Sequence, residues 1–278
     1  MTKEVDLEQA DQLLIELRDI TIVDSTGQGK AWRLAAQVML VTACLGFSLS
    51  AQAAISLSGT RLIFEGKNKE ASIIVRNEGS KVLVQSWIES NTPGDSGELP
   101  FAVTPPLAKM QPNGQQLLRV LYAGKSDLPT NKETVLWLNV QEVPEQVEGE
   151  NTLQLAIRQR IKLFYRPAGI SGTAADAATS LTWQLVQQAG KPALRVVNSS
   201  AFHVPINTVD LSAMAQQEKL STPFMIAPGE THYLTLKNAG ISPQSRLSFK
   251  AVNDYGGVDT FNAQLVSGTP VQAQRATP

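Results

Sequence analysis

Residues 151–167, with the sequence NTLQLAIRQRIKLFYRP, combine alternating apolar side chains with a row of cations. The apolar members recur at every second position, the period of a β-strand with one apolar face: Leu153, Leu155 and Ile157. The basic members also alternate: Arg158, Arg160 and Lys162. A soluble protein normally hides or interrupts such a strand, because an open edge pairs with other chains. The segment therefore belongs either to the protein's own core or to a binding site for a partner chain.

Residues suited to catalysis are few and scattered. His203 and His232 do not form a metal-spaced pair, and Cys44 is the single cysteine. The sequence contains no G-x-S-x-G motif and no phosphate-binding loop. Asp95 and Glu98 lie in a turn-rich stretch, where solvated carboxylates are expected. We therefore expect no enzyme, no catalytic residues, no metal site and no cofactor.

The N-terminal region resembles an export signal. Lys30 and Arg33 precede an apolar run over residues 34–49, and Ala51-Gln52-Ala53 fits an A-x-A cleavage signal. This pattern predicts a secretory signal peptide cleaved after Ala53, and the run is too short and interrupted for an integral membrane span. A lipoprotein signal at Cys44 is the weaker alternative. Residues 1–29 carry seven acids, which fits either a true start further downstream or a regulatory extension.

The composition indicates a globular exported chain. Of 278 residues, 42% are hydrophobic and 18% charged. Residues 1–53 contain four of the 24 basic and seven of the 25 acidic residues, which leaves 20 and 18 and a net charge near +2. That charge gives no argument for nucleic-acid or membrane-surface binding. Without Cys44, the mature core must be stable without disulfides.

The part after Ala53 is a succession of short β-rich runs separated by turn signals. A break at residues 167–172 divides them, so we expect domains over 54–169 and 170–278 after an extension and signal peptide over 1–53. The tail from Ser267 has no apolar period and is expected to fray. The predicted strand-rich runs cover residues 54–66, 70–79, 82–90, 116–124, 134–144, 152–164, 181–188, 193–200, 203–211, 232–238, 245–254 and 261–266.

The segment LPTNKETVLWLNVQEVP, at residues 128–144, is similar to the signature of the periplasmic pilus chaperones of the chaperone–usher pathway. Other segments match this family in the same order, so the resemblance covers about Ala54 to Val266. It implies an all-β fold of two immunoglobulin-like β-sandwich domains, set at an angle with a cleft between them. The further matching segments are GTRLIF at 59–64, TPP at 104–106 with an expected cis proline, IKLFYRP at 161–167 and NDYGG at 253–257.

The resemblance implies a function and a set of residues. Arg61 and Lys162 match the family's cleft cations, which anchor the terminal carboxylate of a bound pilin subunit; converging cations suit that role chemically. Leu153, Leu155 and Ile157 match the strand lent to the subunit's incomplete core by donor-strand complementation. The partners implied are pilin subunits and an outer-membrane usher in the periplasm. Whether the free protein caps its own edge as a dimer is left open.

Three charged residues match a salt-bridge cluster that joins the two domains in the family: Arg119, Glu133 and Asp254. The loop between Pro144 and Leu153 is short and contains no cysteine, which is typical of the short-loop branch that builds rod-like adhesive pili.

The spacing raises one geometric question. Leu155 and Lys162 are seven residues apart, so a regular pleat places them on opposite faces, and a bulge or bend is expected if both contact one ligand. For each of these residues the alternative is an ordinary core or surface position. A passive adhesive immunoglobulin-like protein is the competing function, and a periplasmic solute-binding protein or enzyme is the third, disfavoured by the absence of an α/β pattern.

Overall fold

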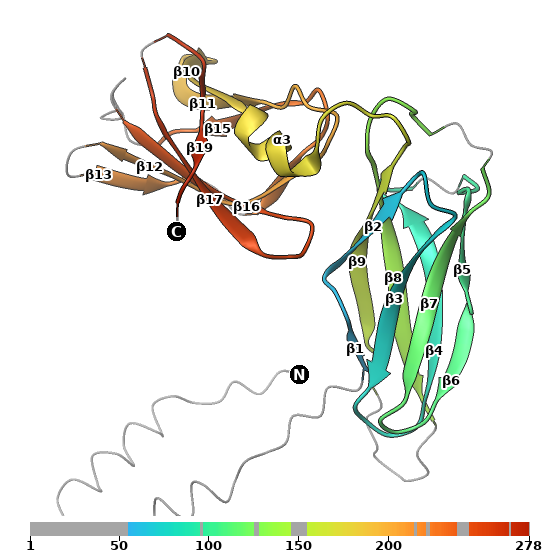
Figure 1. The fold of residues 1–278 in the computed structure, drawn as a ribbon. Coiled ribbons are helices and arrows are strands. Elements are labelled where there is room, and N and C mark those ends of the chain that lie inside the picture. The colour runs from blue at the N-terminus through green and yellow to red at the C-terminus, as the bar shows by residue number, and fades with distance from the viewer. Residues whose placement is uncertain are drawn as a thin grey trace, which may run out of the picture. The chain divides into compact units, whose positions relative to one another are not determined.

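The computed structural model describes residues 55–94, 97–124, 128–145, 155–213, 216–220, 223–237, 245–266 and 268–277. Within these ranges the chain forms two β-sandwiches and one short helix (Figure 1). The expected all-β fold with two sandwich domains is confirmed. The expected signal peptide and Cys44 lie outside the described residues.

The first sandwich contains two sheets (Figure 1). One has the order β1 (Ile55–Leu57), β3 (Glu70–Asn77), β7 (Gln115–Tyr122) and β5 (Phe101–Thr104). The other has the order β2 (Arg61–Glu65), β9 (Arg158–Arg166), β8 (Thr134–Pro144), β4 (Val82–Ser90) and β6 (Leu107–Met110). All neighbouring strands are antiparallel except β2 and β9, which are parallel.

The alternation of apolar residues in these strands determines which face is buried. In β2, Leu62 and Phe64 are buried and their neighbours are only partly so. On β9, Leu163 and Tyr165 are buried in the same core. Because successive side chains point to opposite faces, Arg61 and Lys162 lie on the outer face of the sheet.

The N-terminal strand changes sheets. The amide of Ser58 still donates to the carbonyl of Ile74 on β3 (2.9 Å), yet Arg61 pairs with Lys162 in the other sheet. The chain therefore crosses between the sheets near Gly59 and Thr60. As a consequence, β9 has β2 as a neighbour only from Lys162 onward.

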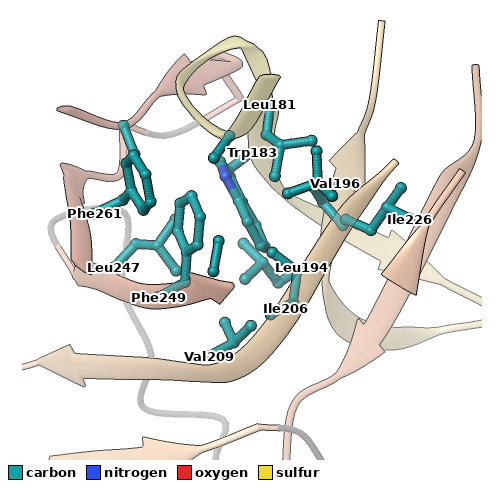
Figure 2. Packing of buried hydrophobic residues seen from close by; sticks show 14 of the residues in the cluster. Leu181, Trp183, Leu194, Val196, Ile206, Val209, Ile226, Leu247, Phe249 and Phe261 are labelled. Atoms are coloured by element: carbon teal, nitrogen blue, oxygen red, sulfur yellow. The ribbon is translucent and has the colours of Figure 1, made fainter. Parts of the chain in front are cut away.

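The second sandwich is built around a separate apolar core. Trp183 is fully buried, with its ring 4.9 Å from that of Phe249, which in turn stacks on Phe261 at 5.0 Å (Figure 2). One sheet has the order β15 (Thr231–Thr235), β11 (Lys191–Val197), β10 (Thr182–Gln188) and β18 (Val271–Gln272). The other has the order β13 (Gln216–Lys219), β12 (Val204–Ala213), β16 (Arg246–Val252), β17 (Val258–Gln264) and β19 (Gln274–Arg275), with β14 (Phe224–Ile226) also on β12.

Two local features differ from the sequence prediction. Helix α3 (Ala174–Ser180) follows the expected linker, with Thr173 as its N-cap accepting from the amide of Asp176 (3.3 Å). The tail was expected to fray, but β18 pairs with β10 and β19 with β17, and Ala273 between them is buried. The tail thus contacts both sheets of the second sandwich.

The strand expected from Asn151 also begins later. Strand β9 starts at Arg158, after Leu155 and Ile157, and Leu153 lies outside the described residues. A single further backbone bond, from the amide of Glu142 to the carbonyl of Ile157 (3.0 Å), extends the ladder with β8. The cis peptide expected in the Thr104–Pro106 turn is confirmed at Thr104–Pro105.

Candidate functional site

Arg61 and Lys162 are direct neighbours across two parallel strands. They form the first register pair between β2 and β9, on the outer face of the sheet. Two residues that match distant motifs in the sequence are thus brought together by the sheet change of the N-terminal strand.

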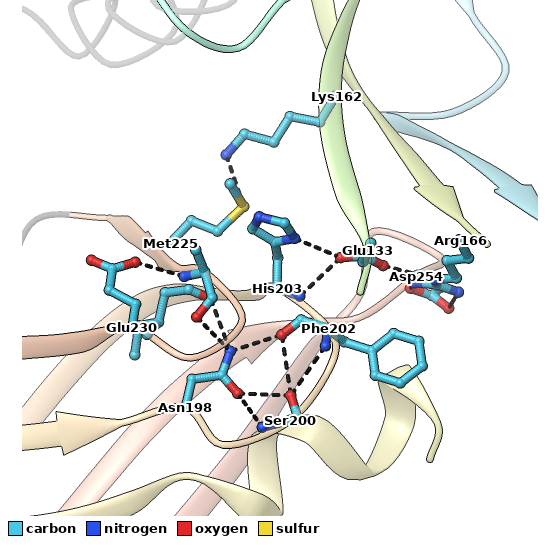
Figure 3. A network of polar contacts seen from close by, with 12 residues as sticks. Glu133, Lys162, Arg166, Asn198, Ser200, Phe202, His203, Met225, Glu230 and Asp254 are labelled. Atoms are coloured by element: carbon cyan, nitrogen blue, oxygen red, sulfur yellow. Dashed lines mark hydrogen bonds and ion pairs between the residues drawn. The ribbon is translucent and has the colours of Figure 1, made fainter. Parts of the chain in front are cut away.

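Lys162 has no acidic partner among the described residues. Its ammonium lies 3.6 Å from the sulfur of Met225 (Figure 3) and 5.5 Å from the centre of the Trp137 ring. Burial lowers the pKa of Lys162 below its ordinary value, and the charge of Arg61 lowers it further.

Arg61 likewise forms no salt bridge within the described part of the chain. One terminal nitrogen donates to the carbonyl of Val252 (3.4 Å), and the guanidinium lies 5.7 Å from the ring centre of Phe164. Its Nε is buried and has no hydrogen-bond partner there. Burial lowers the pKa of Arg61, against the opposing charges of Asp254 and Glu133.

Two adjacent, half-buried cations repel each other and have lost part of their hydration. A bound anion offsets both the repulsion and the lost hydration. A planar carboxylate can accept hydrogen bonds from the guanidinium and the ammonium together. The arrangement therefore suits carboxylate binding.

A free backbone edge leads up to this pair. From Arg158 to Ile161, β9 pairs with β8 on one side and with no other described strand on the other. Near that open side, the Gln159 amide donates to the carbonyl of Ile55 (2.7 Å), which is a side-chain contact. An incoming strand can therefore pair with this part of β9.

Apolar side chains precede the free edge. Leu155 is 66% exposed and Ile157 is 48% exposed, although both have the parity of the buried Leu163. These two side chains continue the core face of β9 without being covered by the sandwich. The described residues therefore place them outside the protein's own core.

The bulge expected between Leu155 and Lys162 is not present from Arg158 to Tyr165, where the register with β8 runs without a shift. Lys162 lies on the outer face, and Leu155 and Ile157 have core-face parity. A strand added at an edge has both faces available, so one ligand can contact both sets without a bulge.

Glu133 and Asp254 are joined by a cation from β9. Arg166 donates from Nε to Glu133 (2.7 Å) and makes two parallel bonds to Asp254 (2.7 and 2.8 Å), as Figure 3 shows. Burial alone would lower the pKa of Arg166, but the hydrogen bonds and charges of Asp254 and Glu133 outweigh it and raise that pKa. The network links the first sandwich to the second.

The assignment of Arg119 to this network was wrong. Arg119 lies on β7 in the other sheet, where its Nε donates to Glu70 (2.9 Å) at an exposed position. Its strand does not reach the outer face that carries Glu133. The sequence contained the correct residue in the IKLFYRP segment, but alternation alone could not show that Arg166 is buried.

His203 was also missed as a network member. Its amide donates to Glu133 (2.9 Å), and its Nδ1 lies 3.0 Å from the same oxygen (Figure 3). Next to this network is a cavity of about 230 Å³, lined in part by Arg61, Phe164, Arg166 and Asp254.

Neither a metal-binding cluster nor a membrane-spanning helix occurs in the described ranges. No three histidine, cysteine or acidic residues there are grouped to hold a metal ion. No helix in those ranges is long and apolar enough to cross a membrane.

Two family models match the chain. The PapD N-terminal domain of pili and flagellar-assembly chaperones matches residues 54–171, and the C-terminal domain of the pili assembly chaperone PapD matches residues 176–263. The chain therefore belongs to the family of pilus-assembly chaperones.

Curated relatives agree with this assignment. The probable fimbrial chaperone YadV of Escherichia coli is 35% identical over 232 residues, which are 80% of this chain and 94% of the relative. The chaperone protein FimB/FhaD of Bordetella pertussis is 35% identical over 248 residues, 84% of this chain and 98% of the relative.

Solved structures are similar as well. The YadV chaperone gives a TM-score of 0.65 at 34% identity and covers 76% of this chain and 100% of its own. A SafB chaperone, solved in complex with the SafA pilin of Salmonella enterica, gives 0.63 at 27% identity and covers 76% and 96%.

Proposed function

We propose that this protein is a periplasmic chaperone that binds pilin subunits through the open edge of β9 and delivers them to an outer-membrane usher. The observation that carries the proposal is the pair Arg61 and Lys162, which has no salt-bridge partner among the described residues and lies where the open edge ends and β2 begins. A passive sandwich protein has no use for two half-buried cations without an anion.

The geometry defines how a subunit strand would bind. A strand that runs along β9 toward Lys162 and ends there has the direction of β9, and so occupies the line that β2 continues. Its terminal carboxylate would accept hydrogen bonds from Arg61 and Lys162. Backbone bonds to β9 would supply affinity that does not depend on the subunit's sequence.

The apolar side chains before β9 would supply selectivity. We propose that Leu153, Leu155 and Ile157 fill pockets in the incomplete core of the subunit, since Leu155 and Ile157 are exposed here. Burial of three such side chains contributes on the order of 5–8 kcal/mol before the cost of ordering the two chains.

Glu133, Arg166 and Asp254 would act as a structural link that keeps the second sandwich beside the binding edge. We also propose that the protein is exported by a signal peptide cleaved after Ala53, with domains over 54–169 and 170–278. Family membership supports these points.

Co-expression with the pilin subunits of the same genome tests the function. The Arg61→Ala, Lys162→Ala double variant should fold but fail to retain a subunit during purification through a tag on the chaperone. Arg119→Ala is the matched control, because it removes an exposed cation from the other sheet. Co-purification of a subunit with the double variant at the wild-type yield would refute the carboxylate anchor.

The apolar strand has its own test. Leu155→Ser with Ile157→Ser should reduce subunit retention strongly while changing the melting temperature little. A large loss of melting temperature instead would place these side chains in the protein's own core.

A further inference from the structure

The outer face of β9 carries charges beyond the carboxylate anchor. Register with β8 places Arg158 opposite Gln141, Arg160 opposite Asn139 and Lys162 opposite Trp137. Alternation therefore puts the three basic side chains on one face, and Gln159 and Ile161 on the core face.

Indole rings hold these cations in a row. The guanidinium of Arg160 lies 4.2 Å from the ring centre of Trp137, the ring that Lys162 also approaches, and that of Arg158 lies 5.8 Å from the ring centre of Trp87. A cation over an aromatic face is attracted to it and loses conformational freedom. The rings therefore favour this arrangement of the cations in the protein without a partner.

One carboxylate, that of Glu89, forms ion pairs with two of these cations. Glu89 lies 3.4 Å from Arg160 and 3.8 Å from Arg158, and it accepts a shorter bond from the Trp87 indole (2.8 Å). That bond and the charge of Arg158 are the main causes that lower the pKa of Glu89, so it is ionised at neutral pH. Within the described residues, Glu89 is thus the single acid that contacts the row formed by Arg158, Arg160 and Lys162.

A strand added to the open edge would place its alternate side chains beside this row. The side chains of the added strand that are in register with Arg158 and Arg160 would lie on the outer face. Leu155 and Ile157 have the parity of the opposite face. Opposite charges on directly adjacent strands attract, and like charges repel. The edge therefore discriminates between strands by the charge of one alternating set of residues.

We propose that the strand accepted by β9 is an extended segment with a free terminal carboxylate and acidic side chains in register with Arg158 and Arg160. The proposal rests on the proposed function, because it assumes strand addition with the terminus at Arg61 and Lys162. It adds a source of selectivity: Arg158 and Arg160 would favour a subunit strand that carries acidic side chains on its outer face.

Short synthetic peptides with a free C-terminal carboxylate test this selectivity. One has two glutamates on one set of alternate positions, a second has them on the other set, and a third has lysines in place of the glutamates on the first set. Labelled at the N-terminus, they are titrated with the whole protein and followed by fluorescence anisotropy. One of the two glutamate peptides should bind roughly five- to ten-fold tighter than the other, which has the same composition.

Variants assign the effect to the row. Arg158→Glu with Arg160→Glu should reverse the preference toward the lysine peptide, and Glu89→Gln should strengthen binding of the favoured acidic peptide by freeing both guanidiniums. Arg76→Glu is the matched control, because Arg76 is exposed on β3 in the other sheet.

The outcomes separate this inference from the proposed function. Equal affinities of the three peptides, with a loss on C-terminal amidation, would overturn the charge selectivity and leave the carboxylate anchor standing. No measurable binding of any peptide, or an unchanged preference in the double Glu variant, would also overturn the inference.

Discussion

Lys162 and Arg166 are four residues apart on the same face of the same strand, yet they have opposite electrostatic environments. The side chain of Arg166 is 8% exposed and is bonded to Glu133 and Asp254. The ammonium of Lys162 has no acidic partner among the described residues and lies near the sulfur of Met225 and the ring of Trp137. Arg166 is therefore neutralised within the protein, whereas Lys162 has no acidic partner there and, under the proposed function, binds an anion from outside.

The pKa directions follow from this difference. Acidic neighbours raise the pKa of Arg166 despite its burial, whereas burial and Arg61 lower that of Lys162. Folding therefore favours protonated Arg166 and disfavours protonated Lys162. The charge of Arg166 is thus stabilised by folding and that of Lys162 is destabilised; under the proposed function, a bound carboxylate would restore the stability lost at Lys162.

The largest effect is expected from removing the neutralised cation. Arg166→Met should lower the free energy of unfolding by about 3–5 kcal/mol, because it leaves the buried Glu133 carboxylate without its cation. Denaturant titration followed by tryptophan fluorescence measures the change. A loss as small as that of an exposed ion pair would show that the network is not a structural link.

Lys162→Met should separate stability from binding. Since folding lowers the pKa of Lys162, its charge opposes folding at neutral pH, below that pKa, and its removal should leave the melting temperature unchanged or slightly higher. Subunit retention should nevertheless be lost. A lower melting temperature with retained subunits would reverse the roles assigned to Lys162 and Arg166.

Glu142 extends the comparison to a buried acid on the core face of β8. It is 3% exposed, and burial raises its pKa against an opposing hydrogen bond from the amide of Ile55. The folded state then binds the proton more tightly than the unfolded state. Stability should therefore fall as the pH rises from the ordinary glutamate pKa, near 4.3, to the raised value.

Glu142→Gln should remove that pH dependence. The variant's advantage in melting temperature should grow across this window and then stay constant toward neutral pH. If the difference in melting temperature between the variant and the wild type were the same at acidic and neutral pH, the raised pKa of Glu142 would be contradicted.

The smallest effect is expected at Arg119. Arg119→Ala removes one exposed ion pair with Glu70, and such pairs contribute little in water. The unfolding midpoint should stay within the error of the titration, and subunit retention should not change. A loss comparable to that of Arg166→Met would restore Arg119 to the structural network.

Alternation predicted most of the strands, because each sheet has one face against a core. The resemblance paired Arg61 with Lys162, but only the sheet change near Gly59 explains why they meet. Arg166 was missed because burial of a charged residue depends on partners distant in sequence. The tail strands were missed because Val271 and Ala273 are too few to form a period.

The pKa of Lys162 tests the central claim most directly. It can be measured by NMR through the Cε signals of labelled lysine, assigned with Lys162→Met, in the free protein and with a subunit-strand peptide bearing a free or an amidated C-terminus. We predict a value below the ordinary lysine pKa, near 10.4, in the free protein, a rise with the free carboxylate and no rise with the amide. An ordinary value in the free protein, or an equal response to both peptides, would contradict the account.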